Sequence, residues 1–303
     1  MRTAYLGTSE FAATVLRRLA DSPHRPVLVV TPPDSRRGRG RRLAPPPAAE
    51  AARELGLTLH QTPDVNSPDS IGEIRAAKPE AVAVCAFGQL ISEPLLDEFT
   101  MLNVHPSLVP RWRGAAPIER ALMAGDEVTG VTIIKVTAGL DSGPIALVEE
   151  VPISPEDDFE SLSARLAERG GELLAAALDA LEADELEVAE QEEGRATYAE
   201  KVAPDDRHLS PAATAAELER VVRALTPHIG AFLELEGGER LGVSRARAVE
   251  DGPAPGVIEV RDGRLVLGSS EGGLSLELVQ PPGKKPMSTA DFLRGHDPPG
   301  KAV

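Results

Sequence analysis

The chain has 303 residues, more than one compact domain usually holds, so we expect two domains that each bury a core. Apolar residues make up 42% and charged residues 26%, and no run reaches the roughly 18 apolar residues of a membrane-spanning helix, so a membrane protein is disfavoured. The net charge of −16 disfavours indiscriminate polyanion binding, and the single cysteine, Cys85, excludes an internal disulfide and favours a reducing, cytoplasmic compartment.

The first half of the chain alternates short β-rich runs with helical patterns. This alternation predicts an α/β domain with a Rossmann-like parallel sheet flanked by helices. We expect strands at residues 3–6, 27–31, 81–87, 102–105, 130–136 and 145–151. We expect helices at residues 10–20, 48–55, 67–76, 117–123 and 158–181, the last of which carries leucines at helical spacing.

The first expected strand-to-helix turn reads Gly7-Thr8-Ser9-Glu10-Phe11. It lacks the three-glycine spacing that brings backbone close to a pyrophosphate, so a nicotinamide oxidoreductase is disfavoured. The sequence also contains no phosphate-loop pattern and no paired Cys/His metal spacing, so we expect no metal site.

A cationic segment, residues 32–47, interrupts this acidic chain and is bracketed by prolines. Its arginines are Arg36, Arg37, Arg39, Arg41 and Arg42. We expect a long irregular loop, and two interpretations stay open at this point. It is either a solvated charge run or a surface that makes one oriented contact with a polyanion.

Asn103 and His105 lie one residue apart in an expected strand. Alternation places both side chains on one face, near the end of the strand where open α/β sheets bind ligands. The loop that follows contains Pro106 and Pro110, which stiffen it. Taken alone, the asparagine is also typical of a backbone cap and the histidine of a surface residue.

Asp141 lies in a glycine-flanked loop, Gly139-Leu140-Asp141-Ser142-Gly143, after another expected strand. The spacing from His105 suits neighbouring strands joined by one helical excursion, so we expect Asp141 to meet His105. A carboxylate beside an imidazole orients the ring and favours its charged form, which suits acyl transfer. Taken alone, Asp141 is also a common turn former.

After residue 181 the sequence becomes acidic and poor in large apolar residues, as in a linker that crosses the surface. A short helix is expected at 218–225. Five short strands are then expected at residues 231–235, 241–245, 256–260, 265–267 and 274–278. This pattern predicts a small β-barrel or sandwich, with an OB-like fold among the possibilities.

The motifs Asn103-Val104-His105 with Ser107-Leu108-Val109-Pro110, and Gly139 to Gly143, resemble the core motifs of the folate-dependent formyltransferase superfamily. Four further segments, in the expected order, resemble the methionyl-tRNA formyltransferase family. They are Pro33-Asp34 through Arg42-Leu43, Arg111 through Ile118, Thr197 through Lys201, and Gln280 through Ser288.

The resemblance implies that a formyl group moves from 10-formyltetrahydrofolate to the α-amine of methionyl initiator tRNA. It implies Asn103, His105 and Asp141 as catalytic residues. It implies a folate slot lined by Phe87, Gly88, Leu90, Ile91, Ser107, Leu108, Val109, Pro110, Gly139 and Leu140. It implies tRNA contacts from the five arginines named above and from Lys201, Lys284 and Lys285.

The resemblance also implies three segments: a catalytic domain at 1–188 with the basic insertion at 32–47, a linker at 189–205, and an OB-like tRNA-binding domain at 206–303. A monomer is expected, since no apolar pattern demands an interface. Two alternatives remain, a folate-dependent formyltransferase acting on a small amine such as an amino-sugar or purine precursor, and a non-enzymatic RNA-binding protein on a decayed enzyme fold.

Overall fold

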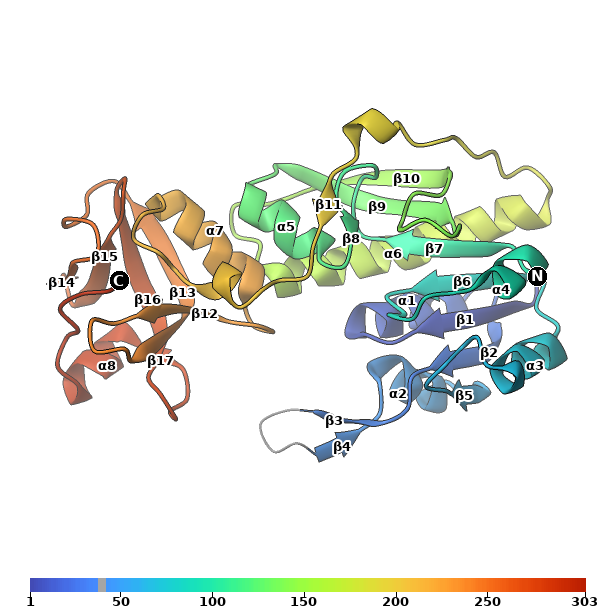
Figure 1. The fold of residues 1–303 in the computed structure, drawn as a ribbon, viewed down its shortest axis with the longest axis horizontal. Coiled ribbons are helices and arrows are strands. Elements are labelled where there is room, and N and C mark those ends of the chain that lie inside the picture. Colours follow the sequence, from blue (N-terminus) through green and yellow to red (C-terminus); the bar gives the residue numbers. More distant parts are fainter. Residues whose placement is uncertain (38–41) are drawn as a thin grey trace. The chain divides into compact units, whose positions relative to one another are not determined.

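A computed structural model describes residues 1–37 and 42–303 (Figure 1). The chain forms two compact units. The first consists of Met1–Gly114, Val128–Pro152 and Ser163–Ala199, and the second of Ala115–Glu127, Ile153–Leu162 and Glu200–Val303. No helix in the described residues is long and apolar enough to cross a membrane.

The first unit is built on a seven-stranded sheet. Across the sheet, the strands lie in the order β10 (Ile145–Pro152), β9 (Val128–Lys135), β7 (Met101–His105), β6 (Ala81–Cys85), β1 (Thr3–Gly7), β2 (Pro26–Thr31) and β5 (Leu59–Gln61). The five strands from β7 to β5 pair in parallel, as expected. The α/β prediction with a parallel-dominated sheet is confirmed.

The last two strands of this sheet run antiparallel to their neighbours, which differs from the expected all-parallel sheet. Strand β9 pairs antiparallel with β7, so the excursion between them does not act as a parallel crossover. The connection from β9 to β10, residues 136–144, is shorter than the dozen or more residues that a parallel crossover needs. A hairpin connection is therefore the geometry that this length permits.

Helices of the first unit pack against the sheet where small residues let them approach. They are α1 (Glu10–Ala20), α2 (Pro47–Glu54), α3 (Pro68–Ala77), α4 (Glu93–Glu98) and α6 (Phe159–Glu182), whose first four residues belong to the second unit. Helix α6 buries Leu166, Leu174 and Leu178, as its leucine spacing predicts. A Cβ atom on Gly170 would lie 2.7 Å from a methyl carbon of Val104 on β7, so glycine permits this close packing.

The arginine-rich segment is more regular than expected. Strands β3 (Ser35–Arg37) and β4 (Arg42–Ala44) pair antiparallel. The expected irregular loop is therefore wrong at its two flanks. The pattern was missed because both strands are polar and too short for an apolar alternation to be visible.

The second unit contains a six-stranded antiparallel sheet, which confirms the expected C-terminal β domain. Its strands are β12 (Ala231–Glu234), β13 (Arg240–Val249), β16 (Gly273–Gln280), β15 (Arg264–Gly268) and β14 (Ile258–Arg261), with β17 (Met287–Ser288) paired to β16. Its helices are α5 (Pro117–Ala124), α7 (Ala215–Leu225) and α8 (Thr289–Gly295). Thr214 and Glu217 form a capping box that begins α7.

Residues 300–303 close this sheet. The amide of Ala302 donates to the carbonyl of Gly256 at 2.8 Å, and the amide of Ile258 donates to Gly300 at 3.0 Å, on the β14 side. On the β12 side, the amide of Val303 donates to the carbonyl of Glu234 at 2.9 Å. One short segment thus pairs with both edges of the sheet and closes it into a barrel.

Candidate active site

Strand β7 carries the first two residues of the site. Asn103 and His105 lie on the same face, as strand alternation predicts, and β7 lies between β6 and β9. Asn103 is half-buried, and His105 is 4% exposed. The sheet therefore holds both polar side chains on a rigid element.

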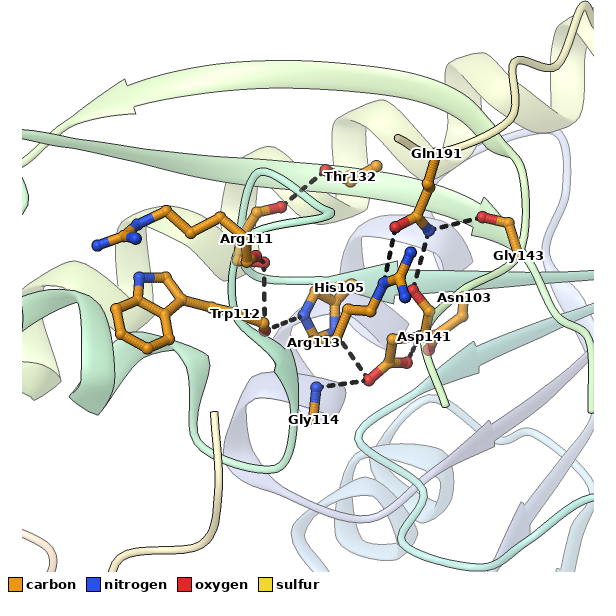
Figure 2. Close-up of polar contacts among 11 residues, drawn as sticks. Asn103, His105, Arg111, Trp112, Arg113, Gly114, Thr132, Asp141, Gly143 and Gln191 are labelled. Carbon is orange, nitrogen blue, oxygen red and sulfur yellow. Dashed lines mark hydrogen bonds and ion pairs between the residues drawn. The ribbon is translucent and has the colours of Figure 1, made fainter. Parts of the chain in front are cut away.

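The β9–β10 loop brings Asp141 to these residues (Figure 2). The Asp141 Oδ1 atom lies 3.4 Å from Nδ2 of Asn103, and Oδ2 lies 3.6 Å from Nδ1 of His105. The backbone amide of Gly114 donates to Oδ2 at 3.0 Å. The expected meeting of Asp141 with His105 is thus found, although a hairpin loop and not a parallel crossover delivers the aspartate.

The backbone around the site is held in unusual conformations. Ala86, Trp112 and Asp141 have φ values of 43°, 63° and 46°. Non-glycine residues adopt this left-handed region at a cost of roughly 1–3 kcal/mol each, and such residues concentrate at functional sites. The positive φ of Ala86 also ends strand β6 at Cys85, two residues earlier than expected.

The hydrogen bonds of His105 define its tautomer. Its Nε2 atom lies 2.9 Å from the carbonyl oxygen of Trp112, and a carbonyl oxygen only accepts, so Nε2 carries a hydrogen. The Nδ1 atom then faces the carboxylate of Asp141. In this tautomer the Nδ1 atom of His105 carries no hydrogen, so Nδ1 and the Asp141 carboxylate both only accept. One additional proton would therefore form a hydrogen bond between them.

The loop after β7 is tightly packed. Ser107 is fully buried; its hydroxyl donates to the carbonyl of Arg111 at 2.7 Å, and its carbonyl accepts from the Thr132 hydroxyl at 2.7 Å. Leu108 fills the space above Gly130, and Val109 is buried. Because these side chains face the protein, the loop is able to offer mainly backbone groups to a ligand.

The other segments expected to line the folate slot, residues 87–91 and 139–140, each carry an exposed leucine. Leu90 is 81% exposed and Leu140 is 63% exposed. Phe87 and Ile91 instead pack with the core next to the sheet. Gly88 has a φ of 78°, which favours glycine. Exposed apolar side chains on loops beside a polar site are available to cover an apolar ligand face.

Arg113 and Gln191 are site residues that sequence reasoning missed. Arg113 is 1% exposed; its Nε atom donates to Oε1 of Gln191 at 3.0 Å, and its Nη1 pairs with Glu193. Its Nη2 atom is buried and has no hydrogen-bond partner in the described part of the chain. Gln191 lies in the expected linker, where nothing in the acidic sequence pattern indicates a role.

The expected tRNA-binding residues are spread over both units. Arg36, Arg42, Lys201, Lys284 and Lys285 are exposed. Arg39 and Arg41, and the side chain of Arg37, lie outside the described residues. Within residues 1–37 and 42–303, no group of three or more His, Cys, Asp or Glu side chains is arranged to hold a metal ion.

Comparisons with known proteins agree along almost the whole chain. The model of the family described as Formyl transferase matches residues 1–178, and that of Formyl transferase, C-terminal domain, matches residues 201–297. Methionyl-tRNA formyltransferase of Halorhodospira halophila (strain DSM 244 / SL1) is 42% identical over 299 residues, which cover 97% of this chain and 96% of that protein.

Two solved structures share the fold. The sugar 3N-formyl transferase WlaRD, crystallised with dTDP and 5-N-formyl-THF, matches with a TM-score of 0.67 at 15% identity, covering 94% of this chain and 99% of that one. HypX from Aquifex aeolicus, in complex with tetrahydrofolic acid, matches with a TM-score of 0.64 at 18% identity. That match covers 97% of this chain but only 47% of HypX.

Proposed function

Because the chain belongs to the methionyl-tRNA formyltransferase family, we propose that it transfers the formyl group of 10-formyltetrahydrofolate to the α-amine of methionyl initiator tRNA. The observation that carries this proposal at the level of residues is the meeting of Asn103, His105 and Asp141 at one point. The folate co-substrate supplies the activated formyl carbon.

Asn103 and His105 stabilise the negative charge that develops on the formyl oxygen as the amine attacks. Asn103 donates from Nδ2. His105 donates from Nδ1 in its protonated form, because its Nε2 hydrogen is already engaged by the Trp112 carbonyl. Both donors are positioned before the reaction, and the loss of one such donor costs on the order of 100- to 1,000-fold in turnover.

Asp141 orients His105 and relays the proton from the attacking amine to the folate nitrogen, whose bond to the formyl carbon breaks as the tetrahedral intermediate collapses. The Gly114 amide holds Oδ2 on the side that faces the imidazole. The Asp141 carboxylate faces the Nδ1 atom of His105, and this atom donates only when the ring carries a hydrogen on both nitrogens. Proton handling of this kind is what transfer from one nitrogen to another requires.

The Asp141→Asn variant tests this assignment. Asparagine tolerates the positive φ about as well as aspartate, so the loop is expected to keep its shape while it loses its proton acceptor. We expect folate binding to persist and formyl transfer to fall by about 100-fold or more. Asp184 also has a positive φ, 58°, and is exposed, so Asp184→Asn is a matched control that keeps activity. Near-normal turnover of Asp141→Asn would overturn the assignment.

The residues expected to line a folate slot fit a flat ligand with a polar edge. The loops at 87–91 and 107–110 supply backbone groups, and the exposed Leu90 and Leu140 supply apolar surface. HypX, which shares this fold over 47% of its length, has been crystallised in complex with tetrahydrofolic acid. We therefore assign folate binding to these loops. Glycine is needed at position 139, because a Cβ atom there would lie 2.2 Å from the Ser142 hydroxyl oxygen.

For tRNA, we assign phosphate contacts to the arginine-rich segment around β3 and β4 in the first unit. In the second unit we assign them to Lys201, Lys284 and Lys285. Residues 1–188 then serve as the catalytic domain, 189–205 as the linker and 206–303 as the tRNA-binding domain. Replacing Arg36 and Arg42 with serine is expected to raise the KM for tRNA, to lower the salt dependence of binding by about one unit of slope per lost phosphate contact, and to spare folate affinity. An unchanged salt slope with unchanged kinetics contradicts this role.

The decisive assay incubates the purified protein with 10-formyltetrahydrofolate and methionyl initiator tRNA, with methionyl elongator tRNA as control. Product confined to the initiator supports both the chemistry and the acceptor. Folate binding without product on either tRNA refutes the acceptor and favours a small amine.

We also propose a cytoplasmic monomer. The single cysteine is buried and unpaired, which fits a reducing compartment. Light scattering at several protein concentrations tests the monomer, and a mass of twice 32.0 kDa contradicts it.

A further inference from the structure

The segment between the two family matches, residues 179–200, contributes directly to the active site. Its last residues form β11 (Tyr198–Ala199), which pairs in parallel with β8 (Arg113–Gly114). Thr197 adds three hydrogen bonds. Its amide donates to the carbonyl of Pro110 at 3.0 Å, and its hydroxyl and carbonyl accept from the amides of Trp112 and Arg113, each at 2.9 Å. The segment is thus clamped to the loop that engages His105.

Gln191 joins the same segment to the aspartate loop. Its Nε2 atom donates to the carbonyl of Asp141 at 2.9 Å and to the carbonyl of Gly143 at 2.7 Å (Figure 2). Arg113 donates to Oε1 of the same amide, so only one orientation of the Gln191 side chain satisfies all three bonds. The amide is therefore fixed with both of its donors on the loop.

The aspartate loop needs such support. Asp141 has a positive φ, which costs an L-residue roughly 1–2 kcal/mol. Two hydrogen bonds from Gln191 to carbonyls on either side of Ser142 offset a cost of that size, at roughly 1 kcal/mol each. Without them, the loop is free to relax and to withdraw its carboxylate from His105.

We propose that Gln191 is a positioning residue, which holds the carboxylate of Asp141 against His105 through the backbone of the aspartate loop. Its consequence for catalysis rests on the proposed formyl transfer. Its structural part, the placement of Asp141 relative to His105, does not. The linker is accordingly part of the catalytic machinery and not only a connection between units.

The first experiment reads the structural part without any substrate. The chain has six histidines, and labelling them with 13C at Cε1 gives one resonance each, with His105 assigned through a His105→Gln variant. We expect Gln191→Met, which keeps the length of the side chain but removes both donors, to shift the His105 resonance and to leave the other five in place. Glu192→Gln, a neighbouring exposed change, is the control and is expected to shift none.

An unmoved His105 resonance in folded Gln191→Met overturns the proposal. Circular dichroism and the thermal midpoint establish that the variant is folded. Should it not fold, Gln191→Glu serves in its place, because the carboxylate keeps the pairing with Arg113 and loses only the donors to the loop. The expected and overturning results are the same for that variant.

The second experiment measures formyl transfer. We expect Gln191→Met to lower kcat by about 10- to 100-fold, as misplacement of a catalytic group by about 1 Å does, with little change in either KM. In the Asp141→Asn background the same change is expected to lower kcat no further, because Gln191 acts through Asp141. Raised KM values with an unchanged kcat, or fully additive losses, overturn the proposal. If the wild-type protein transfers no formyl group while the His105 resonance still moves, the proposed function fails and the positioning role stands.

Discussion

Gly114 is the residue whose replacement tests the site most sharply. Its φ of 116° lies outside the left-handed region that other L-residues adopt, and a Cβ atom there would lie 2.9 Å from the carbonyl oxygen of Ala199. Gly114→Ala therefore forces both a strained backbone and a displacement of β11. We expect the strain to cost roughly 1–3 kcal/mol and the loss of the bond to Asp141 to cost a further 1.5–3 kcal/mol in the transition state.

The matched control is Gly56→Ala. Gly56 also has a positive φ, 66°, but no atom lies within 4 Å of the position that an alanine methyl group would take, so only the backbone cost applies. That cost is roughly 1–2 kcal/mol, since alanine does enter this region. The difference between the two variants therefore measures the contact with Ala199 together with the extra strain of a φ outside the left-handed region.

Urea unfolding followed by tryptophan fluorescence measures the stability difference. The only tryptophan of the sequence, Trp112, lies in the first unit, directly before strand β8, which pairs with β11. Its emission therefore reports on that unit. We expect Gly114→Ala to unfold at lower urea than Gly56→Ala and to lose about 10- to 100-fold in kcat, at 1.4 kcal/mol per factor of ten. Equal stabilities of the two variants, with wild-type kcat for Gly114→Ala, refute the reasoning.

Two further predictions concern titratable groups. Burial raises the pKa of the Cys85 thiol to about 12, so we expect no reaction with a thiol reagent at pH 8 in the native protein and one reacting thiol after unfolding. The hydrogen bond from Arg120 lowers the pKa of Asp206, so this pair stabilises the second unit at neutral pH and loses its effect as the pH falls through the lowered pKa. Asp206→Asn should therefore have a lower free energy of unfolding than wild type at pH 7, by at most about 1 kcal/mol because solvent screens the pair. The free energies of unfolding of the two proteins should converge in acid. A constant difference between them from pH 7 to acid contradicts this linkage.

Local patterns predicted much of the fold and of the site. Asn103 and His105 follow from strand alternation, which depends only on neighbouring residues. The leucines of α6 likewise reveal its buried face. Asp141 was predicted near His105, but the strand direction that delivers it was not, because the orientation of β9 depends on pairing with distant strands.

Gln191 and Gly114 had no local signal. Their roles come from contacts between the linker and two loops that lie about 50 and 80 residues earlier in the chain, as Gln191 with Asp141 and Gln191 with Arg113 show. Such contacts appear in no periodicity or composition window. The β3–β4 hairpin was missed for another reason, since short charged strands carry no apolar alternation.

The closure of the second unit by residues 300–303 has a consequence for synthesis. The ribosome delivers these residues after every strand of that sheet. Until they emerge, Gly256 and Ile258 at the start of β14 and Glu234 at the end of β12 lack the hydrogen bonds that residues 300–303 make, although residues 208–209 already pair with β12 at Phe232. Unpaired edges are templates for pairing with another chain. Loss of residues 300–303 would thus leave every strand of the sheet in place and still expose the start of β14 and the end of β12, which favours aggregation.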